Sequence, residues 1–204
     1  TFIASVRRSY LQYLFEVIDL PFLPDYTDYQ YKVNHKINTK HEISLIGLGS
    51  IDDFKVNEPE DITPEQKATL DQIAIIKQKT NTVGVSWKYN FENGQLLTTL
   101  SNNVLQNNLK QYLDNINEQG LYFSNDSRES QTTFKAEVLK FLDDKSSLSV
   151  GTIVQKNNYE NSTFSVQSLN QFDSKIDFWR YGLFSQFTTT SFSNKLNTSV
   201  GFRI

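Results

Sequence analysis

The clearest pattern in the chain is a strict alternation of apolar and polar residues from position 82 to position 91. The apolar members are Val83, Val85, Trp87, Tyr89 and Phe91, separated by Thr82, Gly84, Ser86, Lys88 and Asn90. Alternate side chains of a β-strand point to opposite faces of a sheet, so the pattern predicts a strand with one apolar and one polar face. Two such different faces indicate a strand at the boundary between two environments.

The same period of two recurs along the chain. Segments 2–7, 29–37, 133–142, 147–155, 179–187 and 196–204 alternate in this way. Segment 43–51 is less clear, because Ile46 and Leu48 place apolar atoms on the second face too. Together with the segment after position 95, about nine antiparallel strands are predicted. The outermost segments run up to both ends of the chain, so we expect a fragment that starts and stops inside strands.

Short turns and long polar connections alternate between these segments. Tight turns are predicted at Asn38-Thr39-Lys40, Asn93-Gly94, Asp143-Asp144-Lys145-Ser146 and Ser193-Asn194-Lys195. At Asn93-Gly94 we expect both central residues to have positive φ. Long connections are expected over 9–26, 54–79, 107–130 and 156–174. Outer-membrane barrels pair short periplasmic turns with long external loops in this manner.

Two of the long connections carry helix signals. A short helical turn is expected between Tyr10 and Ile18, and a capping box with Thr63, Pro64 and Gln66 predicts a helix to about Ala74. Acidic residues precede this helix at Asp52, Asp53, Glu58, Glu60 and Asp61. A cation site is one interpretation of them, but calcium-loop spacing is missing, which favours a solvated external loop.

Composition narrows the possible function classes but does not exclude a membrane protein. The hydrophobic fraction is 38% and the mean hydropathy is -0.48, values that a barrel with alternating faces shares with soluble proteins. Twenty basic and 23 acidic residues give a net charge of -3, which argues against nucleic-acid binding. Cysteine is absent, and His35 and His41 flank a turn without a third metal ligand at recognisable spacing, so no metal or cofactor is predicted.

These observations predict an all-β fold: part of an antiparallel, up-and-down transmembrane β-barrel, with residues 1–204 belonging to one barrel domain. The expected lipid-facing residues are Tyr31, Val33, Val83, Val85, Trp87, Tyr89, Val150, Tyr181, Leu183, Val200 and Phe202. The expected lumen-facing residues are Lys32, Asn34, Lys88, Asn90, Lys135, Glu137, Arg180 and Arg203. A soluble β-sandwich is the structural alternative, because it too buries one face of each strand.

Several short runs resemble TonB-dependent outer-membrane receptors of the Bacteroidetes type. They are Arg7-Arg8-Ser9-Tyr10, Pro21-Phe22-Leu23-Pro24-Asp25-Tyr26, Ile46-Gly47-Leu48-Gly49 with Asp52-Asp53-Phe54, Asn57-Glu58-Pro59, and Gly201-Phe202-Arg203. The resemblance covers nearly the whole chain and points to the first half of the barrel in receptors with a carboxypeptidase-regulatory-like domain ahead of the plug.

The resemblance implies a barrel of roughly 22 strands, blocked by a plug domain, that imports a scarce ligand with energy passed on by TonB. The plug and the TonB-contacting segment are expected before Thr1, and the remaining strands after Ile204. It further implies location in the bacterial outer membrane and contact with its lipid.

The implied ligand is a siderophore or other small molecule, a glycan or a peptide, and a lidding surface lipoprotein is a further conceivable partner. Ligand contacts are expected in the external loops, at Tyr112, Tyr122, Phe123 and Tyr159. The competing hypothesis is a surface or adhesion barrel that displays its loops without transport. We find no set of serine, histidine and carboxylate that predicts an enzyme.

Overall fold

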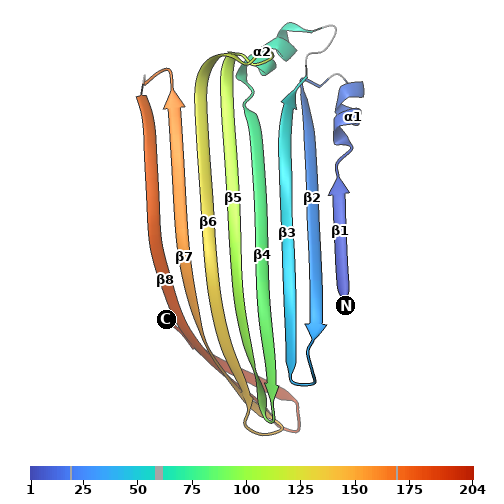
Figure 1. The fold of residues 1–204 in the computed structure, drawn as a ribbon, viewed down its shortest axis with the longest axis vertical. Coiled ribbons are helices and arrows are strands. Elements are labelled where there is room, and N and C mark those ends of the chain that lie inside the picture. Colours follow the sequence, from blue (N-terminus) through green and yellow to red (C-terminus); the bar gives the residue numbers. More distant parts are fainter. Residues whose placement is uncertain (19, 58–61, 169) are drawn as a thin grey trace.

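The computed structural model describes residues 1–18, 20–57, 62–168 and 170–204, and these form one antiparallel sheet of nine strands (Figure 1). The strands are β1 (Phe2–Arg8), β2 (Phe22–Lys36), β3 (His41–Val56), β4 (Ile75–Phe91), β5 (Gly94–Asp114), β6 (Gln119–Phe141), β7 (Ser146–Ser165), β8 (Asn170–Ser191) and β9 (Leu196–Arg203). Each strand pairs with the next in the chain, so the spatial order is the sequence order. The predicted up-and-down arrangement is confirmed.

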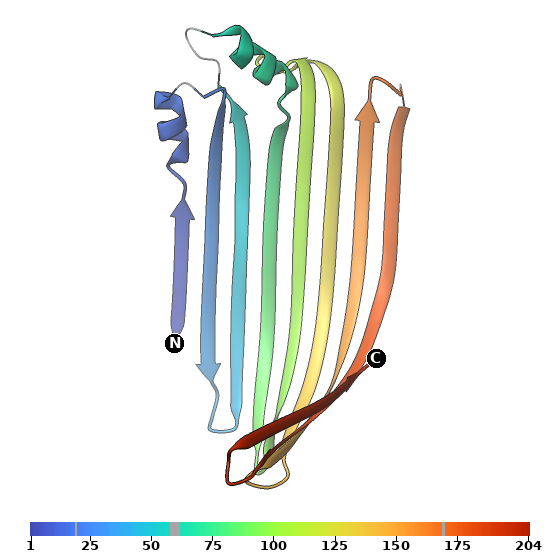
Figure 2. The same ribbon diagram turned by 180° about the vertical axis from the view of Figure 1, so that it is seen from behind.

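The sheet is a single layer. In the part of the chain that the structure describes, the buried hydrophobic side chains are Leu70 and Ile75, and both belong to one end of the sheet. Many large apolar side chains on the strands stay exposed, among them Val85 and Leu100. The second sheet that a β-sandwich needs is not formed by the described residues. Figure 2 shows the same single layer from behind, with its lower end curling so that β9 crosses the view.

The turns at the lower end lie where the sequence predicts them. They connect β2 to β3, β4 to β5, β6 to β7 and β8 to β9. The prediction of positive φ at Asn93-Gly94 is wrong: Phe91 pairs with Gly94, so Glu92 and Asn93 form the turn, and none of these residues has positive φ. Close packing explains the glycine instead, because a Cβ there would collide with the carbonyl oxygen of Leu139 and lie 2.7 Å from the Phe91 ring.

At the upper end, two of the four predicted long loops are strands. The expected loop 107–130 is occupied by β5 and β6, which are joined by residues 115–118, and the expected loop 156–174 by β7 and β8, joined by 166–169. The strict alternation of short and long connections therefore fails on this side of the sheet. The reason is that polar and apolar side chains share a face in these strand halves, as in the cross-strand row of Leu105, Glu129, Tyr159 and Ile176. The strict alternation that marks a strand therefore disappears although backbone pairing continues.

Two helices occupy the remaining long connections. Helix α1 (Leu11–Val17) lies within the predicted 10–18 segment. Helix α2 (Pro64–Gln72) begins with the predicted capping box, in which Thr63 Oγ1 accepts from the Gln66 amide at 3.2 Å and Gln66 Oε1 accepts from the Thr63 amide at 2.9 Å. It ends slightly before the predicted Ala74.

Helix α2 is fixed to the upper edge of the sheet by Asn115. The Nδ2 atom of this buried asparagine donates to the carbonyl oxygens of Leu70 at 2.6 Å and Ile73 at 2.9 Å, while its Oδ1 accepts from the Tyr112 amide at 2.7 Å. Figure 1 accordingly shows α2 at the upper edge of the sheet, above β4 and beside the turn between β5 and β6.

Glu58, Glu60 and Asp61 of the acidic approach, and Glu58-Pro59 of the motif at Asn57, lie outside the described residues. Within the described ranges, no helix is long and apolar enough to cross a membrane.

Candidate functional site: the two faces of the sheet

One face of the sheet carries an uninterrupted apolar row, here called the Val85 row. Residues that pair across neighbouring strands lie on the same face, so the register can be followed from strand to strand. From β1 to β8 the row consists of Phe2, Val33, Leu45, Val85, Leu100, Phe134, Val154 and Tyr181. Val85 is 45% exposed and Leu100 is 55% exposed. Nothing in the described chain covers this row.

Aromatic side chains border the apolar face at its lower end. The ring of His41 stacks on Tyr89 with centroids 4.7 Å apart and on Trp87 at 5.7 Å. The indole Nε1 of Trp87 donates to His41 Nδ1 at 3.2 Å. His41 therefore belongs to an aromatic cluster, and no group of three potential metal ligands occurs among the residues described.

A second aromatic pair lies on the same face farther up β8. Trp179 stacks on Tyr181 with centroids 6.2 Å apart, and the Lys156 ammonium lies 5.7 Å from the Trp179 ring centroid. The apolar part of the face thus has aromatic residues toward both of its borders, an arrangement typical of interfacial belts.

The register separates the two predicted sets of residues completely. All of the candidates predicted to meet lipid share the face of the Val85 row. All of the candidates predicted to meet the lumen lie on the opposite face, here called the polar face.

Some polar-face candidates meet, whereas others remain apart. Lys135 Nζ forms an ion pair with Glu137 Oε2 at 2.8 Å, and Ser149 Oγ donates to Glu137 Oε1 at 2.6 Å. The Lys135 ammonium also lies 5.2 Å from the ring centroid of Phe184. A hollow of about 350 Å³ beside this pair reaches Arg203. No contact joins Lys32 or Arg180 to this group in the described structure.

Two amide atoms on the polar face have no hydrogen-bond partner among the described residues. They are Oδ1 of Asn34 and Nδ2 of Asn157, and both are buried. A buried polar atom without a partner is costly, so these positions favour water or another segment of protein against this face.

The four predicted ligand contacts lie in strands rather than in external loops. Tyr112 belongs to β5, Tyr122 and Phe123 to β6, and Tyr159 to β7. The register places Phe123 and Tyr159 on the polar face. Tyr122 Oη accepts from Gln167 Nε2 at 2.5 Å at the strand tip, and the four rings form no common site.

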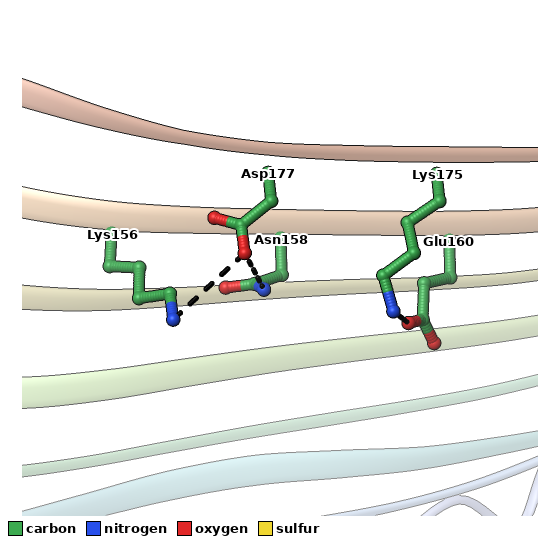
Figure 3. A network of polar contacts seen from close by, with 5 residues as sticks. All are labelled: Lys156, Asn158, Glu160, Lys175 and Asp177. Atoms are coloured by element: carbon green, nitrogen blue, oxygen red, sulfur yellow. Dashed lines mark hydrogen bonds and ion pairs between the residues drawn. The ribbon is translucent and has the colours of Figure 1, made fainter.

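A charged region on the face of the Val85 row escaped the sequence reasoning. Above the apolar part, Lys77, Lys79, Arg128, Glu160 and Lys175 border a surface hollow of about 730 Å³. Figure 3 shows part of it, with Lys175 Nζ 2.6 Å from Glu160 Oε1 and Lys156 Nζ 3.9 Å from Asp177 Oδ2. The sequence pattern places Lys77, Lys79, Arg128 and Glu160 in loops, where side chains have no common face. Only the strand register brings them together with Lys175.

Comparison with solved structures identifies the fold. The ferric yersiniabactin uptake receptor FyuA from Yersinia pestis matches 89% of this chain with a TM-score of 0.58 and 10% sequence identity. FpvA of P. aeruginosa, in a complex with a pyoverdine and iron, matches 90% of it with a TM-score of 0.58 and 14% identity. Both neighbours are TonB-dependent receptors. The chain has the fold of their barrel wall.

The match concerns only a portion of these TonB-dependent receptors. The chain corresponds to 28% of the FyuA chain and 30% of the FpvA chain, so it spans less than a third of either. No family model and no curated protein sequence matches this chain.

Proposed function

We propose that this chain is part of the transmembrane wall of a TonB-dependent outer-membrane receptor that imports a scarce ligand through a plugged barrel. The observation that carries the proposal is the Val85 row. An exposed apolar row that crosses β1 to β8 would be unstable in water and needs an apolar solvent or a partner surface. Lipid supplies that solvent along the whole row, and the fold shared with receptor barrels supports this choice.

A lipid environment also requires that the sheet be closed into a barrel. The sheet has two open edges, at β1 and β9. Unpaired backbone groups at an edge cannot be satisfied in hydrocarbon, so further strands must join both edges to complete the wall. In this proposal the residues predicted to meet lipid and lumen keep these roles, because they already lie on opposite faces.

The polar face would then line the lumen and contact a plug domain. The Lys135–Glu137 pair and the hollow reaching Arg203 offer charged and hydrogen-bonding groups to such a domain. The unpartnered amide atoms of Asn34 and Asn157 support a partner or ordered water at the same face. TonB would act through the plug and through segments outside this chain.

The ligand is proposed only by class: a siderophore, a glycan or a peptide. Both structural neighbours are named for iron-carrying ligands, which favours a siderophore within this set. The Bacteroidetes-type subfamily, and with it a lidding lipoprotein, rests on the short sequence motifs. Phe123 and Tyr159 are the candidates for ligand contact that the lumen hypothesis retains, because they lie on the polar face.

The competing function, a surface barrel that displays its external loops without transport, is less well supported. Two of the four upper connections, between β5 and β6 and between β7 and β8, are only four residues long, and these leave little loop to present to a partner. An adhesion barrel would be expected to carry more of its chain in external loops.

The first test is location and closure of the intact protein. Cells would be fractionated and the protein compared on gels with and without boiling, because a closed barrel resists unfolding by detergent and migrates differently until it is boiled. We expect outer-membrane location and a heat-dependent shift in mobility. A protein recovered in the soluble fraction without a shift would refute the membrane assignment.

Transport is tested separately. Spent culture medium from wild-type cells, a deletion strain, and the same pair lacking TonB would be compared by mass spectrometry. We expect one compound to be depleted only by cells that have both the protein and TonB. Correct membrane location without any TonB-dependent depletion would favour the display hypothesis.

A further inference from the structure

The aromatic cluster at the lower border of the apolar face contains a histidine. His41 is the first residue of β3, and its cross-strand partner on β4 is Tyr89. Trp87 lies two residues from Tyr89 on the same face of β4. The plane of the His41 ring makes an angle of 15° with that of Tyr89 and 3° with that of Trp87. The three side chains therefore form one nearly parallel set of rings.

One hydrogen bond in this cluster depends on the charge of the histidine. The indole Nε1 of Trp87 donates to His41 Nδ1 at 3.2 Å. An indole nitrogen can only donate, so His41 Nδ1 must carry a lone pair, and the proton of the neutral imidazole is then on Nε2. In a protonated imidazole both nitrogens carry hydrogen and neither can accept. Protonation of His41 therefore removes the partner of the Trp87 indole.

The groups that face His41 come from the two neighbouring strands and from the turn before it. Strand β4 contributes Trp87 and Tyr89, and the same face of β2 carries His35 one pairing row farther up. Lys40 precedes His41 in the turn. The other charged residues nearby form one row on the opposite face: Lys36, Glu42 and Lys88. Among the described residues no carboxylate forms an ion pair with His41, so a protonated ring would have no anionic partner to hold it in place.

The position of His41 gives protons access to it. The side chain is half-buried and directly follows the turn between β2 and β3 at the lower end of the sheet. If the proposed function holds, this end carries the short periplasmic turns, and Trp87 belongs to the belt between hydrocarbon and water. The membrane location thus rests on the proposed function, whereas the bond between Trp87 and His41 does not.

We propose that His41 and Trp87 form a pH-sensitive contact at the periplasmic border of the barrel wall. While His41 is neutral, it accepts the indole hydrogen and holds Trp87 parallel to the other two rings. When the periplasm becomes acidic, His41 takes up a proton on Nδ1 and the hydrogen bond to Trp87 breaks, while the imidazolium keeps a favourable contact with the ring of Tyr89. The indole hydrogen then turns to water or lipid headgroups, and the side-chain link between β3 and β4 at this border is lost.

The test observes the donated hydrogen itself by proton–nitrogen NMR of the intact protein in detergent, with isotope-labelled tryptophan. Trp87→Phe and Trp179→Phe assign the two indole signals. Spectra are recorded from about pH 8 down to about pH 5, the range in which histidine ordinarily changes its charge. We expect the proton signal of Trp87 to move toward lower frequency in one step, because its hydrogen bond is lost. The signal of Trp179 should stay in place, since its contacts in the described structure are Tyr181 and Lys156.

The decisive variant is His41→Gln, and His35→Gln is its matched control. Both remove one histidine from the same face of neighbouring strands. His35 is exposed, whereas only His41 accepts from Trp87. We expect His41→Gln to abolish the pH-dependent movement of the Trp87 signal and His35→Gln to retain all of it.

The results separate this inference from the proposed function. A wild type without a heat-dependent mobility shift contradicts the proposed function, and the titration in detergent then still decides whether His41 controls the Trp87 indole. The inference is overturned by a Trp87 signal that stays constant over the pH range, by a movement that persists in His41→Gln, or by an equal movement of the Trp179 signal. The comparison of the two tryptophans in the wild type decides the matter even if a variant fails to fold.

Discussion

Replacing Val85 with lysine tests directly which face of the sheet meets lipid. Val85 lies in the middle of an apolar row, with Leu45 and Leu100 as its cross-strand neighbours, and it is 45% exposed. A lysine on the lipid face of a barrel costs about 2–4 kcal/mol near the bilayer midplane. Since 1.4 kcal/mol is a factor of about ten, the folding equilibrium should fall by a factor of about 30 to 1,000.

Ser86→Lys is the matched control, because the adjacent residue points to the opposite face. Its cross-strand neighbours are Ser44 and Thr99, and the next residue in the same row is Lys135. In a hydrated lumen the new ammonium stays solvated, so the expected loss is below about 1 kcal/mol. Both variants would be measured by reversible denaturant unfolding of the intact barrel in lipid vesicles, followed by tryptophan fluorescence.

The difference between the two variants decides the assignment of faces. A loss for Val85→Lys that exceeds the loss for Ser86→Lys by about 2 kcal/mol or more agrees with lipid on the Val85 side. Equal losses would refute the reasoning, and a larger loss for Ser86→Lys would reverse the faces.

Three further predictions concern the sheet and its turns. Asn115→Ala should cost about 1–3 kcal/mol and accelerate amide exchange in α2, because three hydrogen bonds are lost; unchanged exchange in α2 would contradict this. Gly151→Val should lower the midpoint of thermal unfolding, since overpacking costs about 1–3 kcal/mol and a Cβ would collide with Phe184. The Lys145 amide donates to Asp143 at 2.7 Å, and this bond lowers the pKa of Asp143. Protection of the Lys145 amide should therefore be full above the ordinary carboxyl pKa and be lost as pH falls through the lowered pKa, whereas Asp143→Asn should remove this pH dependence.

The sequence predicts the lower half of the sheet well because one face of its strands is apolar and the other polar, which produces a regular alternation along the chain. In β4, Val83 to Phe91 alternates with polar residues, and the pairing partners on β3 and β5 repeat that alternation at Leu45 and Leu100. The start of helix α2 was equally predictable, because the capping box at Thr63 needs only residues within one helical turn.

The upper half could not be predicted in the same way, because polar and apolar side chains share a face there, as Leu105 and Glu129 do. Asn125 and Asn161 fall in the expected loops 107–130 and 156–174, yet Asn125 Nδ2 donates to Asn161 Oδ1 at 2.7 Å across paired strands. Periodicity carries no signal where both solvents are aqueous. The charged hollow was missed for the same reason: Lys79 and Arg128 are far apart in sequence, and only the register of β4, β5 and β6 places them in one row with Gln106 between them.

Above the Val85 row the contrast between the two faces fades. On the polar face, Gln131 Nε2 donates to Asn157 Oδ1 at 2.8 Å, and Glu129 lies two residues before Gln131 on the same face. On the other face, the charged residues Lys79 and Arg128 lie in one cross-strand row with the amide of Gln106 between them. Both faces therefore mix amides with charges, as expected where both meet water. The apolar–polar contrast on which the membrane proposal rests is confined to the lower part of the strands.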